Sequence, residues 1–85
     1  MELIIHFTAL PEHLSLEAVK SDLADLLEDD GWLTGSGPAF IELELEDEKV
    51  NPKYGILTVK NYLQQAAFAP DTTIELAGTP VGIYE

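Results

Sequence analysis

Residues 39–47 constrain the fold of this chain more than any other stretch, because apolar and polar side chains alternate along most of it. Successive side chains of a β-strand point to opposite faces, so the pattern predicts a strand with one apolar and one polar face. The apolar face is expected to carry Ile41, Leu43 and Leu45 into the core. The polar face carries Phe40, Glu42, Glu44 and Glu46, with Asp47 and Glu48 just beyond. Such a strand belongs to a sheet whose second face stays open.

The glutamates of this strand, Glu42, Glu44 and Glu46, are called the acidic ladder. Residues two apart on a strand lie about 6–7 Å from each other on the same face. At that separation two carboxylates repel by about 0.6 kcal/mol in a water-like dielectric. The ladder therefore costs the protein stability, either as a solvated face that keeps it soluble or as a surface that binds a partner.

A helix is predicted from a cap at Ser15 to about Asp29. Serine is a favoured cap because its hydroxyl accepts a hydrogen bond from a backbone N–H of the first turn. One stripe of this helix is apolar, at the spacing expected for a buried face: Leu16, Val19, Leu23, Leu26 and Leu27. The opposite side is polar and mostly acidic: Glu17, Ser21, Asp22, Asp25, Glu28 and Asp29. Acidic residues at a helix C-terminus are unfavourable, because the helix dipole is negative there.

Four further stretches are predicted to be strands. Residues 2–8 alternate, with Leu3, Ile5 and Phe7 on one side and Ile4, His6 and Thr8 on the other. Residues 32–34 favour a short strand before a turn at 35–38. Residues 73–77 favour another strand, and a turn at 77–80 leads into a last one at 81–84.

Residues 51–69 fit two alternatives. Asn51 followed by Pro52 is typical of a helix cap with proline at the first helical position. Ile56, Thr58 and Val59 instead favour a strand. We prefer a helix over roughly 54–68, which would bury Ile56, Val59, Leu63, Ala66 and Ala67; the alternative is a strand at 54–59 and a short helix from Tyr62 to Phe68.

The order of these elements predicts the fold class. The predicted order is a strand, a helix, one or two strands, a second helix, and one or two further strands. This order indicates an α+β protein with four to five strands in one small sheet. Two helices are expected on one face of this sheet, as in a split βαβ or ferredoxin-like sandwich or a variant of it. Residues 1–85 are expected to form a single domain, which suits the length of the chain.

Charge limits the partners of the chain. Sixteen acidic residues against four lysines give a formal net charge of −12. This charge repels phosphate backbones, and without arginine the chain lacks the planar guanidinium group that binds phosphates with two hydrogen bonds, so direct nucleic-acid binding is not expected.

The sequence contains no cysteine that could form a disulfide or a thiolate site. The apolar run at 3–5 is too short for a signal region or a membrane span, so we expect a cytoplasmic protein with no membrane partner.

The residue types that often carry catalysis occur here without the partners that such chemistry needs. His6 is expected at the surface facing a carboxylate and His13 in a solvated loop, neither beside a second strong metal ligand. Ser36 lies between glycines, but a proline follows where a nucleophile elbow requires another pattern. The acidic runs at 28–30 and 46–48 lack the ligand spacing of an EF-hand. We therefore predict no enzyme activity, no cofactor and no metal.

The functional hypothesis is a negative surface that binds a basic protein. The ladder would form it together with Asp47 and Glu48 and with the acidic side of the first helix, namely Asp25, Glu28 and Asp29. Opposite potentials accelerate association and favour one partner over others. Phe40 and Ile4, beside the carboxylates, would supply the apolar anchor that charge alone does not provide.

In its size, acidity, lack of cysteine and α+β layout the chain resembles the small immunity proteins that bacteria make against their own toxin domains, for example nucleases. The resemblance implies a cytoplasmic bacterial inhibitor that covers the basic active site of a cognate toxin with an acidic surface. Two alternatives stay open: a nucleic-acid mimic that competes for the groove of a host protein, and a structural or regulatory module that self-associates through an open sheet face or edge strand. The sequence does not decide between a monomer and a dimer.

Overall fold

The computed structural model describes residues 1–48, 51–76 and 78–84. Its elements, in chain order, are β1 (Glu2–His6), α1 (Leu16–Leu27), the short 3-10 helix η1 (Glu28–Asp30), β2 (Gly31–Gly37), β3 (Phe40–Leu45), α2 (Pro52–Gln65), β4 (Thr73–Leu76) and β5 (Thr79–Gly82). No helix in this described part of the chain is long and apolar enough to cross a membrane.

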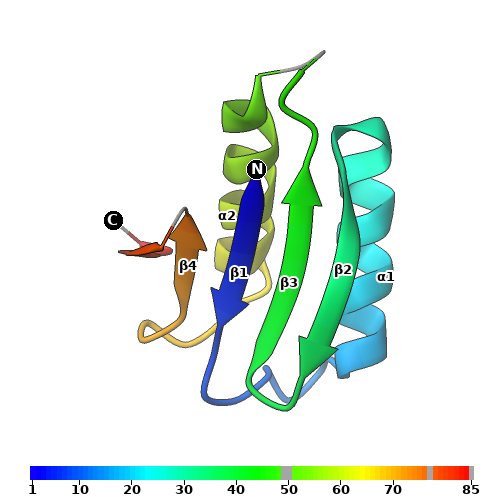
Figure 1. Ribbon diagram of the computed structural model, residues 1–85. Coiled ribbons are helices and arrows are strands. Elements are labelled where there is room, and N and C mark those ends of the chain that lie inside the picture. Colours follow the sequence, from blue (N-terminus) through cyan, green and yellow to red (C-terminus); the bar gives the residue numbers. More distant parts are fainter. Residues whose placement is uncertain (49–50, 77, 85) are drawn as a thin grey trace.

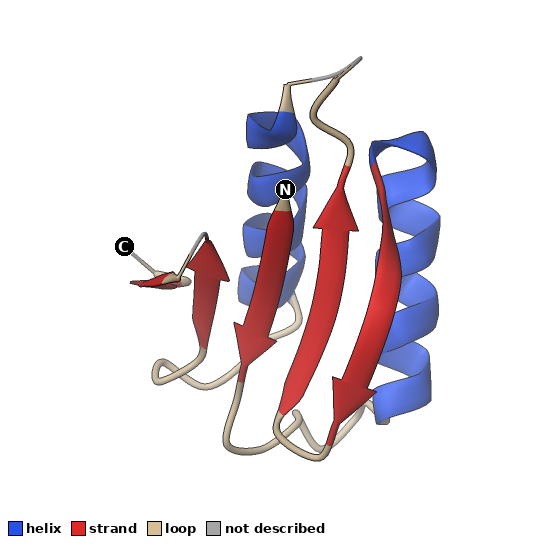
Figure 2. Ribbon diagram, viewed as in Figure 1, coloured by secondary structure: helices blue, strands red, loops and turns tan. Residues whose placement is uncertain are grey.

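The strands form one antiparallel sheet in the order β2-β3-β1-β4-β5. Both helices lie behind the sheet on the same face, α1 behind β2 and α2 behind β1 and β4 (Figures 1 and 2). The predicted α+β class, with up to five strands and two helices on one face, is confirmed. Each helix links two parallel strands that are separated by one antiparallel strand: α1 connects β1 to β2 across β3, and α2 connects β3 to β4 across β1. This is the split βαβ arrangement, with β5 added at one edge.

The core fills the space between the sheet and the helices. Every second residue of the central strands points into it, as the alternation predicts, so Ile41, Leu43 and Leu45 are all buried. The buried apolar residues are Leu3, Ile5, Phe7, Val19, Leu23, Leu27, Ile41, Leu43, Leu45, Val59, Leu63, Phe68, Ile74 and Ile83. Phe7 and Phe68 meet edge to face with ring centroids 6.1 Å apart, a favourable aromatic geometry.

Helix α1 begins at the predicted cap. The Ser15 hydroxyl accepts a hydrogen bond from the N–H of Ala18 at 3.2 Å. The helix ends at Leu27, two residues earlier than predicted, because Glu28 has a φ of 46° that an α-helix cannot accommodate. The predicted burial of Leu26 is also wrong: its side chain is 48% exposed and lies on the flank of α1 that faces α2.

Helix α2 decides the ambiguous segment in favour of a single helix, which starts earlier than predicted. Asn51 is the cap and accepts from the N–H of Lys53 at 3.0 Å, with Pro52 in the first turn. The cap and the burial of one helical stripe outweigh the strand preference of the β-branched residues. Of the expected core residues, Ala67 is exposed, because the helix has already ended and its φ is 63°.

Two predicted turns are partly strand. Residues 35–37 continue β2, so the connection to β3 is only Pro38 and Ala39. Thr79 and Pro80 likewise belong to β5, which ends at Gly82 and was predicted at 81–84. Glycine and proline were interpreted as turn signals in both places, whereas pairing with a neighbouring strand determines the backbone here.

Candidate binding site

The sheet surface that points away from the helices is called the open face. The strand register places its residues in rows across β2, β3, β1 and β4. One row holds Gly35, Glu42, Ile4 and Glu75, and the next holds Gly37, Phe40, His6 and Thr73. In a third row Trp32 lies opposite Glu44, and Glu44 lies opposite Glu2. Apolar and acidic side chains are therefore interspersed on one continuous surface.

Three large apolar side chains occupy the open face. Trp32 is 51% exposed, and Ile4 and Phe40 are half-buried. Ile4 and Phe40 are diagonal neighbours on adjacent strands, a separation that side chains of this size bridge. Because no described helix or strand covers them, they are available as apolar anchors.

Two glycines of β2 shape this surface. A Cβ at Gly37 would clash with the edge of the Phe40 ring, and a Cβ at Gly35 would lie 3.3 Å from Oε2 of Glu42. The side chains of Phe40 and Glu42 therefore lie flat across β2, where other residues would carry side chains of their own. The ring and the carboxylate reach toward the outer edge of the sheet as a result.

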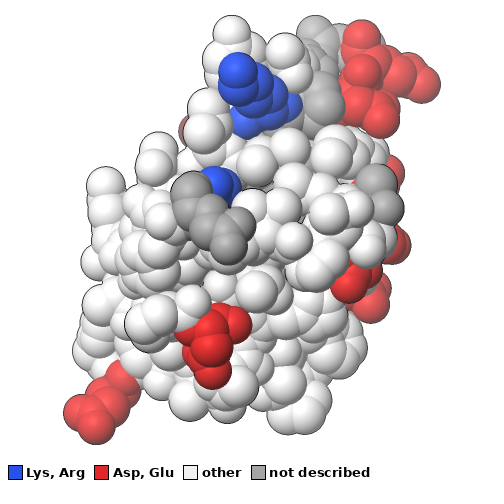
Figure 3. Space-filling view, turned by 90° about the vertical axis from the view of Figure 1, so that its left-hand side faces the viewer, with Lys and Arg blue, Asp and Glu red and all other residues white. Residues whose placement is uncertain are grey.

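The charge of the open face is predominantly negative. Its carboxylates are Glu2, Glu42, Glu44 and Glu75. The one basic side chain described on it is His6, whose Nε2 lies 3.4 Å from Oε1 of Glu75, as the sequence predicts for a surface histidine beside a carboxylate. The described lysines lie on the helices, namely Lys20 on α1 and Lys53 and Lys60 on α2. Figure 3 shows the sheet edge-on, with carboxylates along the right-hand margin where the open face lies and a largely uncharged surface toward the viewer.

Two of the predicted site carboxylates are engaged within the molecule. The amino group of Met1 donates to Oε1 of Glu44 at 3.0 Å and to Oδ2 of Asp47 at 3.2 Å. The hydrogen bond to Glu44 raises the pKa of this amino group above 8.0, and Asp47 adds to the rise. The repulsion between the opposed Glu2 and Glu44 is thereby partly offset.

The remaining residues after β3 leave the open face. Since β3 ends at Leu45, Glu46 lies beyond the strand, where its Oε1 accepts from the N–H of Glu48 at 2.8 Å. The N–H of Glu46 in turn donates to the carbonyl of Asp30 in η1 at 2.8 Å. Glu46, Asp47 and Glu48 thus lie at the end of the sheet where η1, which begins at Glu28, enters β2.

The structure does not bring the acidic side of α1 together with the ladder. Asp25 lies on the helix layer, which covers the opposite face of the sheet, so the two groups point away from each other. The side chain of Asp29 lies outside the described residues. The strand and helix carboxylates therefore do not form the single surface that the sequence predicts. Glu42 and Glu44 lie on the open face, Asp25 lies on the helix layer, and the carboxylates after β3 lie at one end of the sheet.

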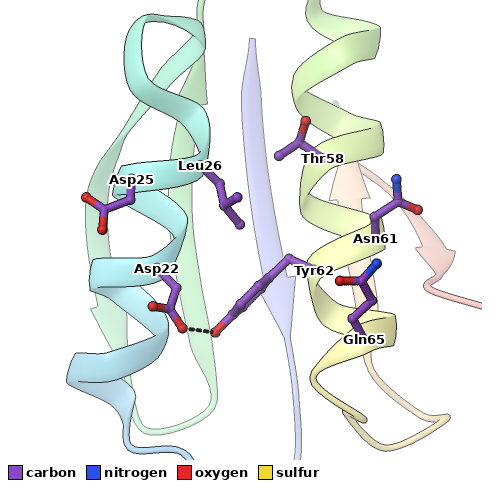
Figure 4. A pocket seen from close by; sticks show the side chains of 7 residues that line it. All are labelled: Asp22, Asp25, Leu26, Thr58, Asn61, Tyr62 and Gln65. Atoms are coloured by element: carbon purple, nitrogen blue, oxygen red, sulfur yellow. Dashed lines mark hydrogen bonds between the residues drawn. The ribbon is translucent and has the colours of Figure 1, made fainter.

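Asp25 lines a groove of about 470 Å³ between the two helices. The other lining residues are Asp22, Leu26, Thr58, Asn61, Tyr62 and Gln65. Figure 4 shows Tyr62 reaching from α2 to α1, where its hydroxyl donates to Oδ2 of Asp22 at 2.8 Å. Burial raises the pKa of Tyr62 above its usual 10.0, and the hydrogen bond to Asp22 raises it further. This contact joins the two helices across the groove.

Sequence reasoning missed Trp32 as a member of the site. Its side chain points to the open face because it pairs with Glu44, and a bulge between Leu33 and Gly35 then shifts the register of β2. The neighbouring Leu33 packs against the core. Because successive side chains of a strand point to opposite faces, an inward Leu33 could have predicted that Trp32 lies on the open face. Among the described residues no group of three or more histidine, aspartate or glutamate side chains is arranged to hold a metal ion.

Fold and site together define a small α+β protein of split βαβ topology, with one sheet face that no described helix or strand covers and that carries both acidic and apolar side chains. No protein-family model, no curated protein and no solved structure matches this chain.

Proposed function

We propose that this protein is a non-enzymatic binding protein that neutralises a basic partner, and that it binds this partner with the open face. The composition of that face carries the proposal. Trp32, Ile4 and Phe40 offer apolar contact area, and carboxylates surround them with no described lysine on the same surface. Aromatic anchors within a charged rim are the usual composition of a protein interface.

The class of partner follows from charge. A net charge of −12 attracts basic surfaces and repels acidic ones, and this raises the rate of association with the former. The resemblance to immunity proteins makes a cognate bacterial toxin domain, for example a nuclease, the partner that we propose. The open face would cover its basic active site, and the cytoplasm is the compartment that we propose for this inhibition.

Affinity capture tests the proposal. The tagged protein is incubated with a lysate of its native host, and bound proteins are eluted with rising salt and identified by mass spectrometry. We expect one basic protein that is released only at high salt, because screening weakens charge attraction. Its activity should fall when the purified protein is added back.

A pair of charge-matched variants then locates the interface. Glu42→Gln/Glu44→Gln removes two charges from the open face, and Glu17→Gln/Asp25→Asn removes two from the helix layer. We expect the first to weaken binding at least about tenfold and the second by less than about twofold. Equal losses in both would mean that net charge alone acts, and loss only in the helix variant would place the interface elsewhere.

A further inference from the structure

The two edges of the sheet are built differently. β5 has four residues and contains Pro80, which has no N–H to donate, so this edge is poorly suited to pairing. β2 has seven residues, Gly31–Gly37, and contains neither proline nor a charged side chain. β2 pairs only with β3, and no other described segment pairs with its outer side. The edge at β2 is therefore the one that can accept a further strand.

The backbone of β2 presents hydrogen-bonding groups to this edge. The N–H of Leu45 donates to Met1, so the backbone of Leu45 points to β1 and away from β2. Gly31 lies opposite Leu45, and two residues further along Leu33 lies opposite Leu43, so the backbone of Leu43 also points to β1. Backbone direction alternates along an antiparallel pair, so the N–H and C=O of Leu33 point outward from the sheet.

The side chains beside this edge favour a basic occupant. The Glu42 carboxylate lies across Gly35, and Trp32 is exposed on the same face. A strand added to β2 would lie about 4.8 Å away. Lysine or arginine side chains on its open-face side would then meet the carboxylate, and could also lie over the indole ring in a cation–π contact.

We infer that the β2 edge binds an extended basic segment of the partner as a sixth strand, with alternate lysine or arginine side chains over the open face. The inference rests on the proposed function and specifies how the partner is held. Main-chain hydrogen bonds to β2 provide attachment, and the side chains of Glu42 and Trp32 select the basic residues. The opposite, apolar side of the added strand would extend the core face of the sheet.

The test uses a synthetic peptide of about eight residues in which lysine and valine alternate, a length within the range of natural strands. Two further forms of the peptide carry N-methyl groups on alternate amides, which removes the N–H donors from one edge of the extended peptide. The first form is methylated on the odd-numbered amides and the second on the even-numbered ones, so each blocks a different edge. Binding is followed by the fluorescence of Trp32, which is the single tryptophan of the chain. Hydrogen exchange of the Leu33 amide, with Val81 of β5 as the control, reports pairing at β2.

We expect one N-methylated form to bind at least about tenfold more weakly than the parent peptide and the other to bind about as well, because only one peptide edge faces β2. Leu33 exchange should slow at least about tenfold on binding, while Val81 is unchanged. Glu42→Gln should weaken binding of the parent peptide several-fold, and Asp25→Asn should leave its binding unchanged.

Three outcomes would overturn the inference. Equal binding of all three peptides would show attachment by charge alone, which leaves the proposed function standing. Absence of binding, or binding without protection of Leu33, would remove the edge from the interface. A dimer of the protein alone, with Leu33 already protected, would make a second copy the occupant. The proposed function fails separately, when the open-face variant captures its basic partner as well as the wild type does.

Discussion

The hydroxyl of Thr72 is buried and has no hydrogen-bond partner among the described residues. The backbone holds it there, because the N–H of Thr72 donates to Ala69 at 3.0 Å and its carbonyl accepts from Ile83 at 3.3 Å. A buried hydroxyl without a partner costs about 1–3 kcal/mol.

Thr72→Val replaces this hydroxyl by a methyl group of similar size. We expect the free energy of unfolding to rise by about 1 kcal/mol, because the cost of burying the polar group is removed. Urea denaturation measures the change. Thr72→Ser is the control, since it keeps the hydroxyl and loses the methyl group, and it should lower stability. A loss of stability in the valine variant would contradict the expectation.

The hydrogen bond from Tyr62 to Asp22 is the second contact with a testable energy. Tyr62→Phe should lower the free energy of unfolding by about 1 kcal/mol at neutral pH. Because the folded-state pKa of Tyr62 is raised above 10.0, its contribution is fully present below pH 10 and is lost as the pH rises through the folded-state value. The stability difference between wild type and variant should therefore shrink above pH 10.

Urea denaturation at neutral and at high pH measures this difference. Tyr54→Phe is the matched control, since the Tyr54 side chain is 65% exposed and its loss should change stability little at neutral pH. Equal losses in the two phenylalanine variants would show that the contact with Asp22 is energetically unimportant.

At the scale of elements, α1 depends on its cap. Ser15→Ala removes the hydrogen bond to the N–H of Ala18, and we expect a loss of about 1 kcal/mol in the free energy of unfolding. Ser21→Ala, within the exposed side of the same helix, should be neutral or slightly stabilising because alanine is the better helix former. The two variants are compared by thermal or urea denaturation. Losses of similar size in both would argue against a capping role.

The elements that the sequence predicts best are those in which one local pattern decides the structure. β3 follows from strict alternation, and the start of α1 from its serine cap. The length of β2 is not predicted, because glycines at 35 and 37 normally indicate a turn. Here they make room for the side chains of Phe40 and Glu42 on the next strand, a contact that the sequence of β2 alone does not show. The exposure of Leu26 likewise depends on where α2 packs. Local patterns predict elements, and contacts between elements set their ends.

At the scale of the whole molecule, the charge acts on stability. Sixteen acidic residues against four lysines leave a net charge of −12, and the excess carboxylates on this small protein repel one another through water. Raising the salt concentration from about 10 to about 200 mM shortens the range of this repulsion, so Tm should rise. If screening contributes about 1 kcal/mol, the rise is about 4–8 °C for a protein of this size. Calorimetry in sodium chloride measures it, and a flat response would show that the charge does not affect stability.

The location of that charge could be predicted only in part. Alternation placed Glu42 and Glu44 on one face of a strand, which the structure bears out. It could not show that Asp25 would lie on the other side of the sheet, because that depends on which face the helices cover. A pattern in one segment places residues relative to that segment, and only the packing of segments decides which acidic groups share a surface.

The position of β1 has a consequence for how the protein is made. The first strand of the chain is the central strand of the sheet, and both of its partners, β3 and β4, come later. Pairing of Ile5 with Ile74 cannot occur until residues 73–76 have been synthesised. A chain emerging from the ribosome therefore carries β1 without its second neighbour until residues 73–76 have been made, and such distant pairings make folding slow.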